Sequence, residues 1–370
     1  MREGEGMKVT FADVLEIRNG KNQKAVENPE GAYPIYGSGG IMGRADGYIC
    51  PANTVVIGRK GSINNPLFVT EPFWNVDTAF GLVPDETRLL PQYLYYFCIH
   101  FDFEKLNTTV TIPSLTKANL LKIAIDLPEM KVQKQVVAVL GKTEVIIQKR
   151  QQQISALDNL IKARFVEMFG DCQANPKGWS TVALDEIADV GSSKRVFVDE
   201  LKDSGIPFFR GTEIGALAEG LAIRPELFIS KEHYDKLVKA TGKPSIGDLL
   251  MPSICPDGRI WVVNTEDPFY FKDGRVLWVH VTNKCFDPVF LLYTLKDRIM
   301  TDYGSIASGT TFSELKIFSL KKCKVFDVPI EDQRHFSVFV KQVDKSKSGI
   351  QKSLDETRVL FDSLMQQYFC

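Results

Sequence analysis

The sequence predicts an α+β protein in which two similar, mostly-β globular domains are separated by a pair of long antiparallel coiled-coil helices. Three observations predict this class. The chain repeats its own pattern once, at an offset close to 200 residues. The front part of each copy carries short β-branched and aromatic runs between Gly, Pro and Asn, which is typical of strands and turns. The back part of each copy has few helix breakers and a helical spacing of apolar residues.

The repeat is visible at three landmarks. VTFADVLEIRNGK from Val9 aligns with VALDEIADVGSSK from Val182, an offset of 173 residues. LPQYLYYF aligns with DPVFLLYT at an offset of 197, and near the end of each copy Gln133 falls on Gln333, an offset of 200. A period of this length is too long for a solenoid repeat. We therefore interpret the chain as a whole domain, with its tail, present twice.

The landmarks divide the chain into four segments. Residues 1–128 and 173–329 are expected to be the two globules, and residues 129–172 and 330–370 the long helices that follow them. Runs such as NTVVIGRKG and RVLWVHVT predict strands, and PQYLYYFCIHF predicts a helix inside the first globule.

Each long helix carries a stripe of residues that steps by alternating fours and threes, the 3.5-residue repeat of a coiled coil. From residue 136 to residue 168 the first helix is about 50 Å long at 1.5 Å per residue, more than one small globule can cover. The two stripes are therefore expected to pack against each other. The alternative is two unrelated helices that each pack on a core. Apart from polar interruptions, the stripes consist of Val136, Leu140, Ile147, Ile154, Leu157, Ile161 and Met168, and of Phe336, Val340, Val343, Ile350, Leu354, Phe361 and Leu364.

Composition excludes several classes of protein. The chain has 370 residues, enough for roughly two or three domains, and 45 basic against 46 acidic residues, so a polyanion would have to bind to local patches. No apolar run is long enough for a membrane helix and the N-terminus does not resemble a signal peptide, which predicts a cytoplasmic protein. The seven cysteines never form C-x-x-C and the four histidines are scattered, so neither a disulfide framework nor a metal site is expected.

No catalytic group of residues is found. DPFY from Asp267 differs by one residue from the D-P-P-Y tetrapeptide of amino-methyltransferases, but no Gly-rich turn for S-adenosylmethionine precedes it, so a turn before a strand is the preferred interpretation. GSGGIMG from Gly37 lacks the G-x-G-x-x-G spacing of a phosphate-binding loop. We therefore predict a non-catalytic protein with no cofactor of its own.

Loops that mix Arg or Lys with Gly, Ser, Thr and Asn recur three times in each copy. YGSGGIMGR, IGRKGSINN and NTTVTIPS stand in the first, and FRGTEIG, PSICPDGRI and ASGTTFS in the second. Phosphates are bound by basic side chains, hydroxyls and backbone N–H groups, and bases by Arg, Asn or Gln, so these loops suit duplex DNA. The residues predicted to face DNA are Arg44, Arg59, Lys60, Ser62, Asn64, Thr109, Arg210, Thr212, Ser253, Asp257, Arg259 and Thr310.

From end to end the chain resembles the specificity (S) subunit of type I restriction-modification systems. PKGWSTVALDEIADV at the entry to the second copy and the approaches NTTVTIPSLTKANLLKIAIDLP and SGTTFSELKIFSLKKCKVFDVP carry the resemblance, as do the helix starts at Pro128 and Pro329 with a Gln four or five residues later. The chain departs from the family in its first copy, which has no counterpart of Trp179, and in the second helix start, which is not proline-rich.

The resemblance implies two target-recognition domains, each reading one half of a split target in double-stranded DNA, with the helix pair fixing the unread spacer. It also implies partners: two methyltransferase (M) subunits and, in the full complex, endonuclease/translocase (R) subunits. S-adenosylmethionine, Mg²⁺ and ATP would belong to those partners.

Two other functions remain open at this point. In a protein-interaction scaffold the β globules would bind peptides, with affinity insensitive to salt. In a stand-alone DNA methyltransferase DPFY would be used, and the isolated chain would retain S-adenosylmethionine.

Overall fold

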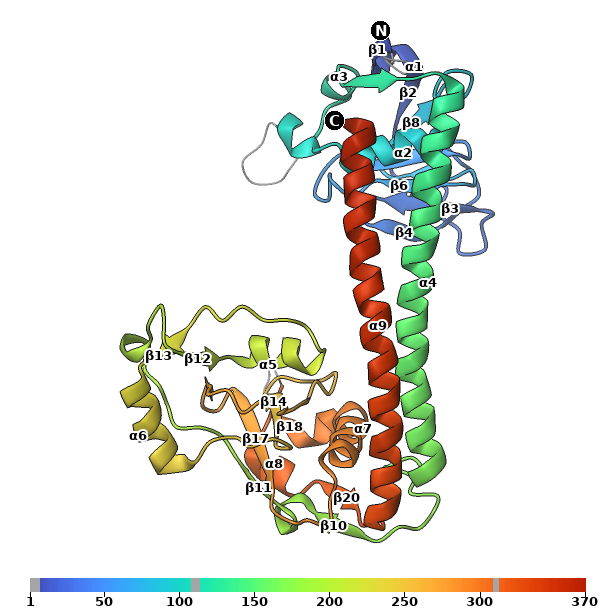
Figure 1. Ribbon diagram of the computed structural model, residues 1–370. Coiled ribbons are helices and arrows are strands. Elements are labelled where there is room, and N and C mark those ends of the chain that lie inside the picture. Colours follow the sequence, from blue (N-terminus) through green and yellow to red (C-terminus); the bar gives the residue numbers. More distant parts are fainter. Residues whose placement is uncertain (1–6, 108–113, 309–312) are drawn as a thin grey trace. The chain divides into compact units, whose positions relative to one another are not determined.

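The computed structural model describes residues 7–107, 114–308 and 313–370 of the chain (Figure 1). The chain divides into two compact units: one comprises Met1–Gln153 with Ile350–Cys370, and the other Ile154–Gly349. The boundary cuts the long helices α4 (Met130–Phe169) and α9 (Ile330–Phe369), so each unit holds one globule and a part of both helices.

The first unit is built around a four-stranded antiparallel sheet, with a three-stranded and a two-stranded sheet beside it. In sheet order the strands are β2 (Leu15–Asn19), β8 (Ala79–Pro84), β5 (Thr54–Gly58) and β6 (Leu67–Val69); β4 (Gly40–Ala45), β3 (Tyr33–Gly37) and β7 (Trp74–Asn75); and β1 (Met7–Thr10) with β9 (Ala124–Leu127). Strand β5 reads TVVIG and is buried throughout. Val55 and Ile57 face one apolar cluster and Val56 faces another, which explains why no polar residue alternates with them.

The predicted helix PQYLYYFCIHF is confirmed as α2 (Pro91–His100), which begins with Pro in its first turn, where no backbone N–H is needed. Leu94 and Phe97 of α2 share an apolar cluster with Val55 of the sheet and Leu140 of α4. This cluster is the core of the first unit, and it fixes the sheet to the start of the long helix. The remaining helical segments of the unit are short: α1 (Phe11–Val14), η1 (Phe103–Leu106) and α3 (Lys117–Leu120).

The second unit repeats these sheets in the same strand order and adds one short pair. The strands are β11 (Ala188–Gly191), β17 (Val276–Val281), β14 (Leu249–Pro252) and β15 (Trp261–Val262); β13 (Phe228–Ile229), β12 (Ile206–Phe209) and β16 (Tyr270–Phe271); β10 (Thr181–Ala183) with β20 (Lys324–Phe326); and β18 (Ala307–Ser308) with β19 (Glu314–Leu315). In both units the three-stranded sheet contains one parallel pair, β3 with β7 and β12 with β16.

Helix α7 (Pro288–Ile306) takes the place of α2 in the second unit. The Asp287 carboxylate caps it by accepting hydrogen bonds from the backbone N–H groups of its first turn. Phe290 of α7 is fully buried among Leu249 and Val279 of the sheet and Phe336 of α9. The other helical segments are α5 (Gly211–Ala218), α6 (Lys231–Thr241), α8 (Ile317–Lys321), η2 (Leu184–Glu186) and η3 (Val198–Glu200).

Strand registers confirm the internal repeat residue by residue. In the first unit Leu82 of β8 lies opposite Ile17 on one side and Val55 on the other. In the second unit Val279 of β17 lies opposite Val190 and Leu249 in the same way. The shifts from Ile17 to Val190 and from Leu82 to Val279 are the 173 and 197 residues found in the sequence.

The long helices run antiparallel within each unit. In the first unit the Arg150 side chain of α4 donates hydrogen bonds to the Ser353 carbonyl and the Thr357 hydroxyl of α9. In the second unit Lys347 of α9 pairs with Asp158 of α4. The predicted fold class, two similar mostly-β globules with an antiparallel helix pair, is confirmed. Each of the fourteen predicted stripe residues is buried or half-buried.

The predicted stripe misses two buried residues at the end of α4. Phe165 and Phe169 are 3% and 0% exposed, and their rings lie 5.5 Å and 5.7 Å from that of Phe336. Both also contact Phe290 of α7, with ring centroids 6.1 Å and 4.8 Å apart. The helix therefore buries a second face here, because it packs against the globule as well as against α9.

Candidate nucleic-acid interface

Three strand ends meet at one edge of the four-stranded sheet in the first unit. Strand β5 ends at Gly58, opposite Ala79 where β8 begins, and β2 ends at Asn19, opposite Phe80. Residues that follow or flank these ends are brought together even though they are far apart in the sequence. The predicted residues Arg59, Lys60, Ser62 and Asn64 all belong to the loop that leaves this edge.

Described residues from each of the three loops predicted for the first copy lie close together here. A Cβ at Gly58 would lie 3.1 Å from the Cβ of Ser38 in the β3–β4 turn, so those two loops touch. Lys60 forms a backbone bridge with Ser114, which joins the loop to the third segment. Glycine is required at position 58, because a side chain would meet the Ser62 carbonyl oxygen at 2.3 Å.

Arg59 occupies the centre of this edge. Its exposed guanidinium lies over the Phe80 ring, 5.7 Å from the centroid, a cation–π arrangement that favours this position of the long side chain. A pocket of about 290 Å³ opens beside it and is lined by Asn19, Arg59, Phe80, Ser114, Leu115, Thr116 and Lys117.

The remaining predicted residues of the first copy have different surroundings. Lys60 and Ser62 are exposed on the same loop. The Asn64 carboxamide donates to Asp102 at 3.0 Å and accepts from the Phe103 N–H at 2.7 Å, so it fastens the loop to the segment after α2. Arg44 is exposed on β4, but its guanidinium donates to the backbone carbonyls of Gly31 and Ala32. Thr109 lies outside the described residues.

In the second unit the corresponding edge carries different side chains. The predicted residue Ser253 follows β14 and is 1% exposed, so its hydroxyl is not at the surface. Beside it, the Arg275 guanidinium pairs with the Glu314 carboxylate, which also lies 3.3 Å from the Lys316 ammonium. Thr310 of the third loop lies outside the described residues.

Arg210 and Thr212 are engaged at the start of α5. The Arg210 guanidinium donates to Glu213 at 2.6 Å and to Glu226 at 3.1 Å, and the exposed Thr212 hydroxyl donates to Glu213 at 3.1 Å. Burial raises the pKa of the Glu213 carboxyl, but hydrogen bonds from the Arg210 guanidinium and backbone N–H outweigh burial and lower this pKa to about 2. Glu213 is therefore ionised at neutral pH and holds Arg210 in place.

Arg259 and Asp257 form an ion pair on the loop after β14, with Nε and Oδ2 2.8 Å apart. Glu219 is a second acidic neighbour of Arg259 at 3.9 Å. A Cβ at Gly215 of α5 would lie 2.9 Å from the Arg259 guanidinium, so the side chain packs across the helix. The predicted cations of the second copy are thus paired with carboxylates, in contrast to Arg59.

Asn19, Lys117, Arg275 and Glu314 lie at these edges but are absent from the predicted set. Their positions depend on which strand ends adjoin, and loop composition does not encode strand pairing. In the sequence, only the internal repeat indicated these positions, because it relates the segment before Leu115 to the segment before Leu315 at an offset of 200 residues.

Neither DPFY nor a second pocket gathers groups suited to catalysis. Asp267 belongs to a turn before β16, and Phe269 and Tyr270 are 5% and 1% exposed, as expected for a turn that enters a strand.

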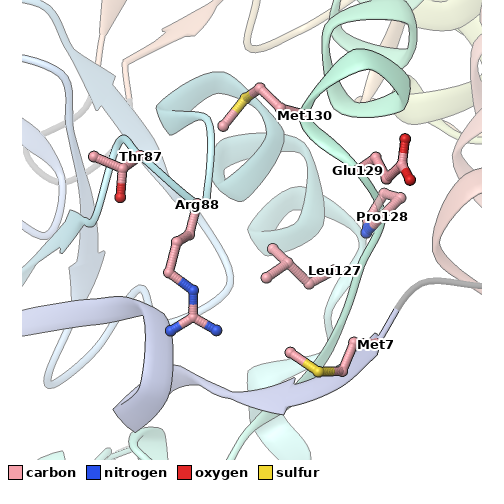
Figure 2. A pocket seen from close by; sticks show the side chains of 7 residues that line it. All are labelled: Met7, Thr87, Arg88, Leu127, Pro128, Glu129 and Met130. Atoms are coloured by element: carbon pink, nitrogen blue, oxygen red, sulfur yellow. The ribbon is translucent and has the colours of Figure 1, made fainter.

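The second pocket, of about 360 Å³, lies where β9 leads into α4 (Figure 2). The Arg88 guanidinium in its lining donates a hydrogen bond to the Asp13 carbonyl at 2.7 Å. Figure 2 shows the Glu129 carboxylate pointing away from this guanidinium. The pocket is lined by Met7, Thr87, Arg88, Leu127, Pro128, Glu129 and Met130.

Within the described ranges, no group of three or more His, Cys, Asp or Glu side chains could hold a metal ion. No helix in the same ranges combines the length and apolar character needed to cross a membrane.

Residues 4–156 match the family described as the type I restriction modification DNA specificity domain. The chain is 23% identical over 364 residues to a Haemophilus influenzae protein named as a type I restriction enzyme specificity subunit, covering 95% of this chain and 91% of that protein. It is also 23% identical over 335 residues to the specificity subunit of the type I restriction enzyme MjaVIII of Methanocaldococcus jannaschii, covering 82% and 73%.

Solved structures share the fold. The S subunit of a type I restriction-modification system from M. genitalium superposes with a TM-score of 0.62 over 100% of this chain and 97% of that one, at 16% identity. A chain from a study of complex assembly and conformational transition in a type I restriction-modification system superposes with a TM-score of 0.55, also at 16% identity, over 98% and 97%.

Proposed function

Because the chain belongs to the family of type I restriction-modification DNA specificity subunits, we propose that its two globules, residues 1–128 and 173–329, each read one half of a bipartite target in double-stranded DNA. The protein is then a recognition subunit without catalytic activity or a cofactor of its own. It acts in the cytoplasm, where the DNA of its host lies.

The observation that supports this most is the sheet edge present in both units. Two copies of one fold carry polar loops at the same place, but Arg59 stands on the first edge and Arg275 with Glu314 on the second. One fold that is present twice with different polar side chains is suited to recognising two different DNA sequences. Base contacts specify such sequences, while phosphate contacts from residues such as Lys60 add affinity.

We assign the helices two roles in this proposal. They set the length of the unread spacer, and they dock two methyltransferase subunits, to which endonuclease/translocase subunits add in the full complex. Chemistry on DNA would then be supplied by those partners.

Binding and methylation by the full chain together with its methyltransferase subunits test the proposal. We expect a bipartite motif in the methylated DNA, and an affinity for duplex DNA that falls steeply with salt because phosphate contacts release counterions. Affinity for a protein ligand that does not change with salt, without DNA binding, would instead support a scaffold.

The spacer role has its own test. Seven residues are inserted into both helices, after Gln153 in α4 and before Ile350 in α9, which lengthens each helix by about 10 Å. The motif should keep both half-sites and gain about three base pairs of spacer, at 3.4 Å per base pair. Insertion into one helix alone should abolish recognition, because the stripes lose register. An unchanged spacer in the double insertion would contradict the spacer role.

A further inference from the structure

Hydrogen bonds of the backbone show which residues of the two sheet edges correspond. In the first unit the Leu115 N–H donates to the Arg59 carbonyl at 2.9 Å, and in the second the Leu315 N–H donates to the Ser253 carbonyl at 2.7 Å. These bonds align Arg59 with Ser253.

A second bond supports the alignment. The Arg59 N–H donates to the Thr78 carbonyl at 2.7 Å, as the Ser253 N–H does to the Arg275 carbonyl at 2.9 Å. Thr78 therefore corresponds to Arg275, and the backbone hydrogen bonds are the same although the side chains differ.

The support under Arg59 is also specific to the first unit. Phe80 lies opposite Ile57 in the first sheet, and the matching pair in the second sheet is Leu277 opposite Met251. The aromatic face that orients the Arg59 guanidinium is thus replaced by an aliphatic side chain, and the arginine itself by a buried serine.

The described neighbours of the Arg59 guanidinium do not neutralise its charge. Throughout the described part of the chain no carboxylate lies within ion-pair distance of its guanidinium, and the nearby Lys117 ammonium is directed to the Ile17 carbonyl at 2.6 Å. Arg59 is therefore a cation of this edge that lies over an aromatic ring and, among the described residues, has no carboxylate partner.

We propose that Arg59 reads a guanine in the half-site recognised by residues 1–128, an inference that rests on the proposed function. Guanine presents two acceptors, O6 and N7, in the major groove, and a planar guanidinium matches them with two parallel N–H groups. The contact with the Phe80 ring favours the observed position of the guanidinium before DNA arrives, which reduces the side-chain entropy lost on binding.

The second globule has no arginine at the position that corresponds to Arg59. Its corresponding place is filled by Ser253, and the neighbouring Arg275 is neutralised by Glu314. The guanine specified by Arg59 consequently belongs to one half of the target only.

The test uses the full chain with its methyltransferase subunits and a library of duplexes randomised in both half-sites. Arg59→Ala should make one guanine position of the first half-site indifferent to sequence, with a loss of roughly 5- to 150-fold on the best wild-type sequence. Arg59→Lys keeps the charge but lacks the planar pair of N–H groups, so it should select guanine less strongly than the wild type. The second half-site should stay unchanged in both variants, which shows that each variant complex is folded.

Lys60→Ala is the matched control, because it removes an exposed cation from the next position. It should weaken all library members about equally, as loss of a phosphate contact does. An Arg59→Ala complex that still selects the wild-type first half-site, or that weakens every sequence equally, overturns the inference while leaving the proposed function intact. If the wild-type complex selects no bipartite motif, the proposed function itself fails.

Discussion

Gln133 and Gln333 make the same three hydrogen bonds in the two units. The Gln133 side-chain carbonyl accepts from the Leu90 N–H, and that of Gln333 from the Asp287 N–H, both at 2.8 Å. Each carboxamide nitrogen also donates to two backbone carbonyls, those of Arg88 and Pro128 for Gln133 and those of Cys285 and Val328 for Gln333. Both side chains are 0% exposed. One residue therefore joins the first turn of a long helix to the start of the helix that covers the sheet.

We predict that Gln333→Leu lowers the free energy of unfolding by about 2–4 kcal/mol, because three buried backbone groups lose their partner without gaining water. Gln342→Leu is the control, since Gln342 is exposed on the same helix. Chemical denaturation of both variants measures the difference. Equal stability of the two variants would show that the buried carboxamide contributes no more than an exposed one.

The helix stripe can be tested inside α9. Leu354 is 2% exposed and Val359, five residues later, is 69% exposed. Leu354→Asp places a carboxylate where no water reaches it, and we expect a loss of more than about 3 kcal/mol, or failure to fold. Val359→Asp should change stability by less than about 0.5 kcal/mol. Thermal unfolding followed by circular dichroism distinguishes them, and similar losses in both would contradict the stripe.

The contact between the loops of the first edge leads to another prediction. Gly58→Ala puts a methyl group 2.3 Å from the Ser62 carbonyl oxygen, so the loop that carries Arg59 must move. We expect a loss of about 1–3 kcal/mol in stability together with weaker selection of the first half-site. Gly39→Ala, with nothing within 4 Å of the new methyl group, should leave both unchanged. Library selection with each variant complex measures the half-site, and unaltered selection by Gly58→Ala would count against this loop as a reader.

The duplication and the helix pair could be predicted from the sequence because both leave a periodic signal. The offset from Val9 to Val182 reappears in the strand registers, and the 3.5-residue steps fall on buried or half-buried positions along both helices. Phe165 and Phe169 could not be predicted as core residues. They are buried by α7, a neighbour more than 100 residues away in the sequence, and a helical period says nothing about a second partner.

Prediction of the candidate site was less complete for a physical reason. Loop composition suggested Arg59, Arg210 and Arg259 equally, because all three are cations among small polar residues. The structure gives Arg210 and Arg259 acidic partners, while the Arg59 guanidinium lies over the Phe80 ring. Which cation is neutralised depends on contacts between elements, and these cannot be deduced from one segment at a time.

The last prediction concerns acid. In the folded protein the pKa of Glu213 is about 2, below its ordinary value of 4.5, because hydrogen bonds from Arg210 outweigh the effect of burial. A carboxyl group whose pKa is lowered by folding stabilises the protein above its ordinary pKa, and this stabilisation is lost as pH falls toward the folded value. We therefore expect the Glu213 contribution to be complete above about pH 4.5 and to disappear between about pH 4.5 and pH 2.

Glu213→Gln removes this titration, because its side chain stays neutral at every pH. Urea denaturation at a series of pH values should show a variant that is less stable than the wild type at pH 7, with a difference that shrinks steadily below about pH 4.5. Glu266→Gln, which removes an exposed carboxylate from the same unit, is the matched control for the change in net charge. A stability difference between Glu213→Gln and the wild type that stays constant from pH 7 to pH 2.5 would mean that the Arg210–Glu213 pair does not hold the start of α5 through its charge.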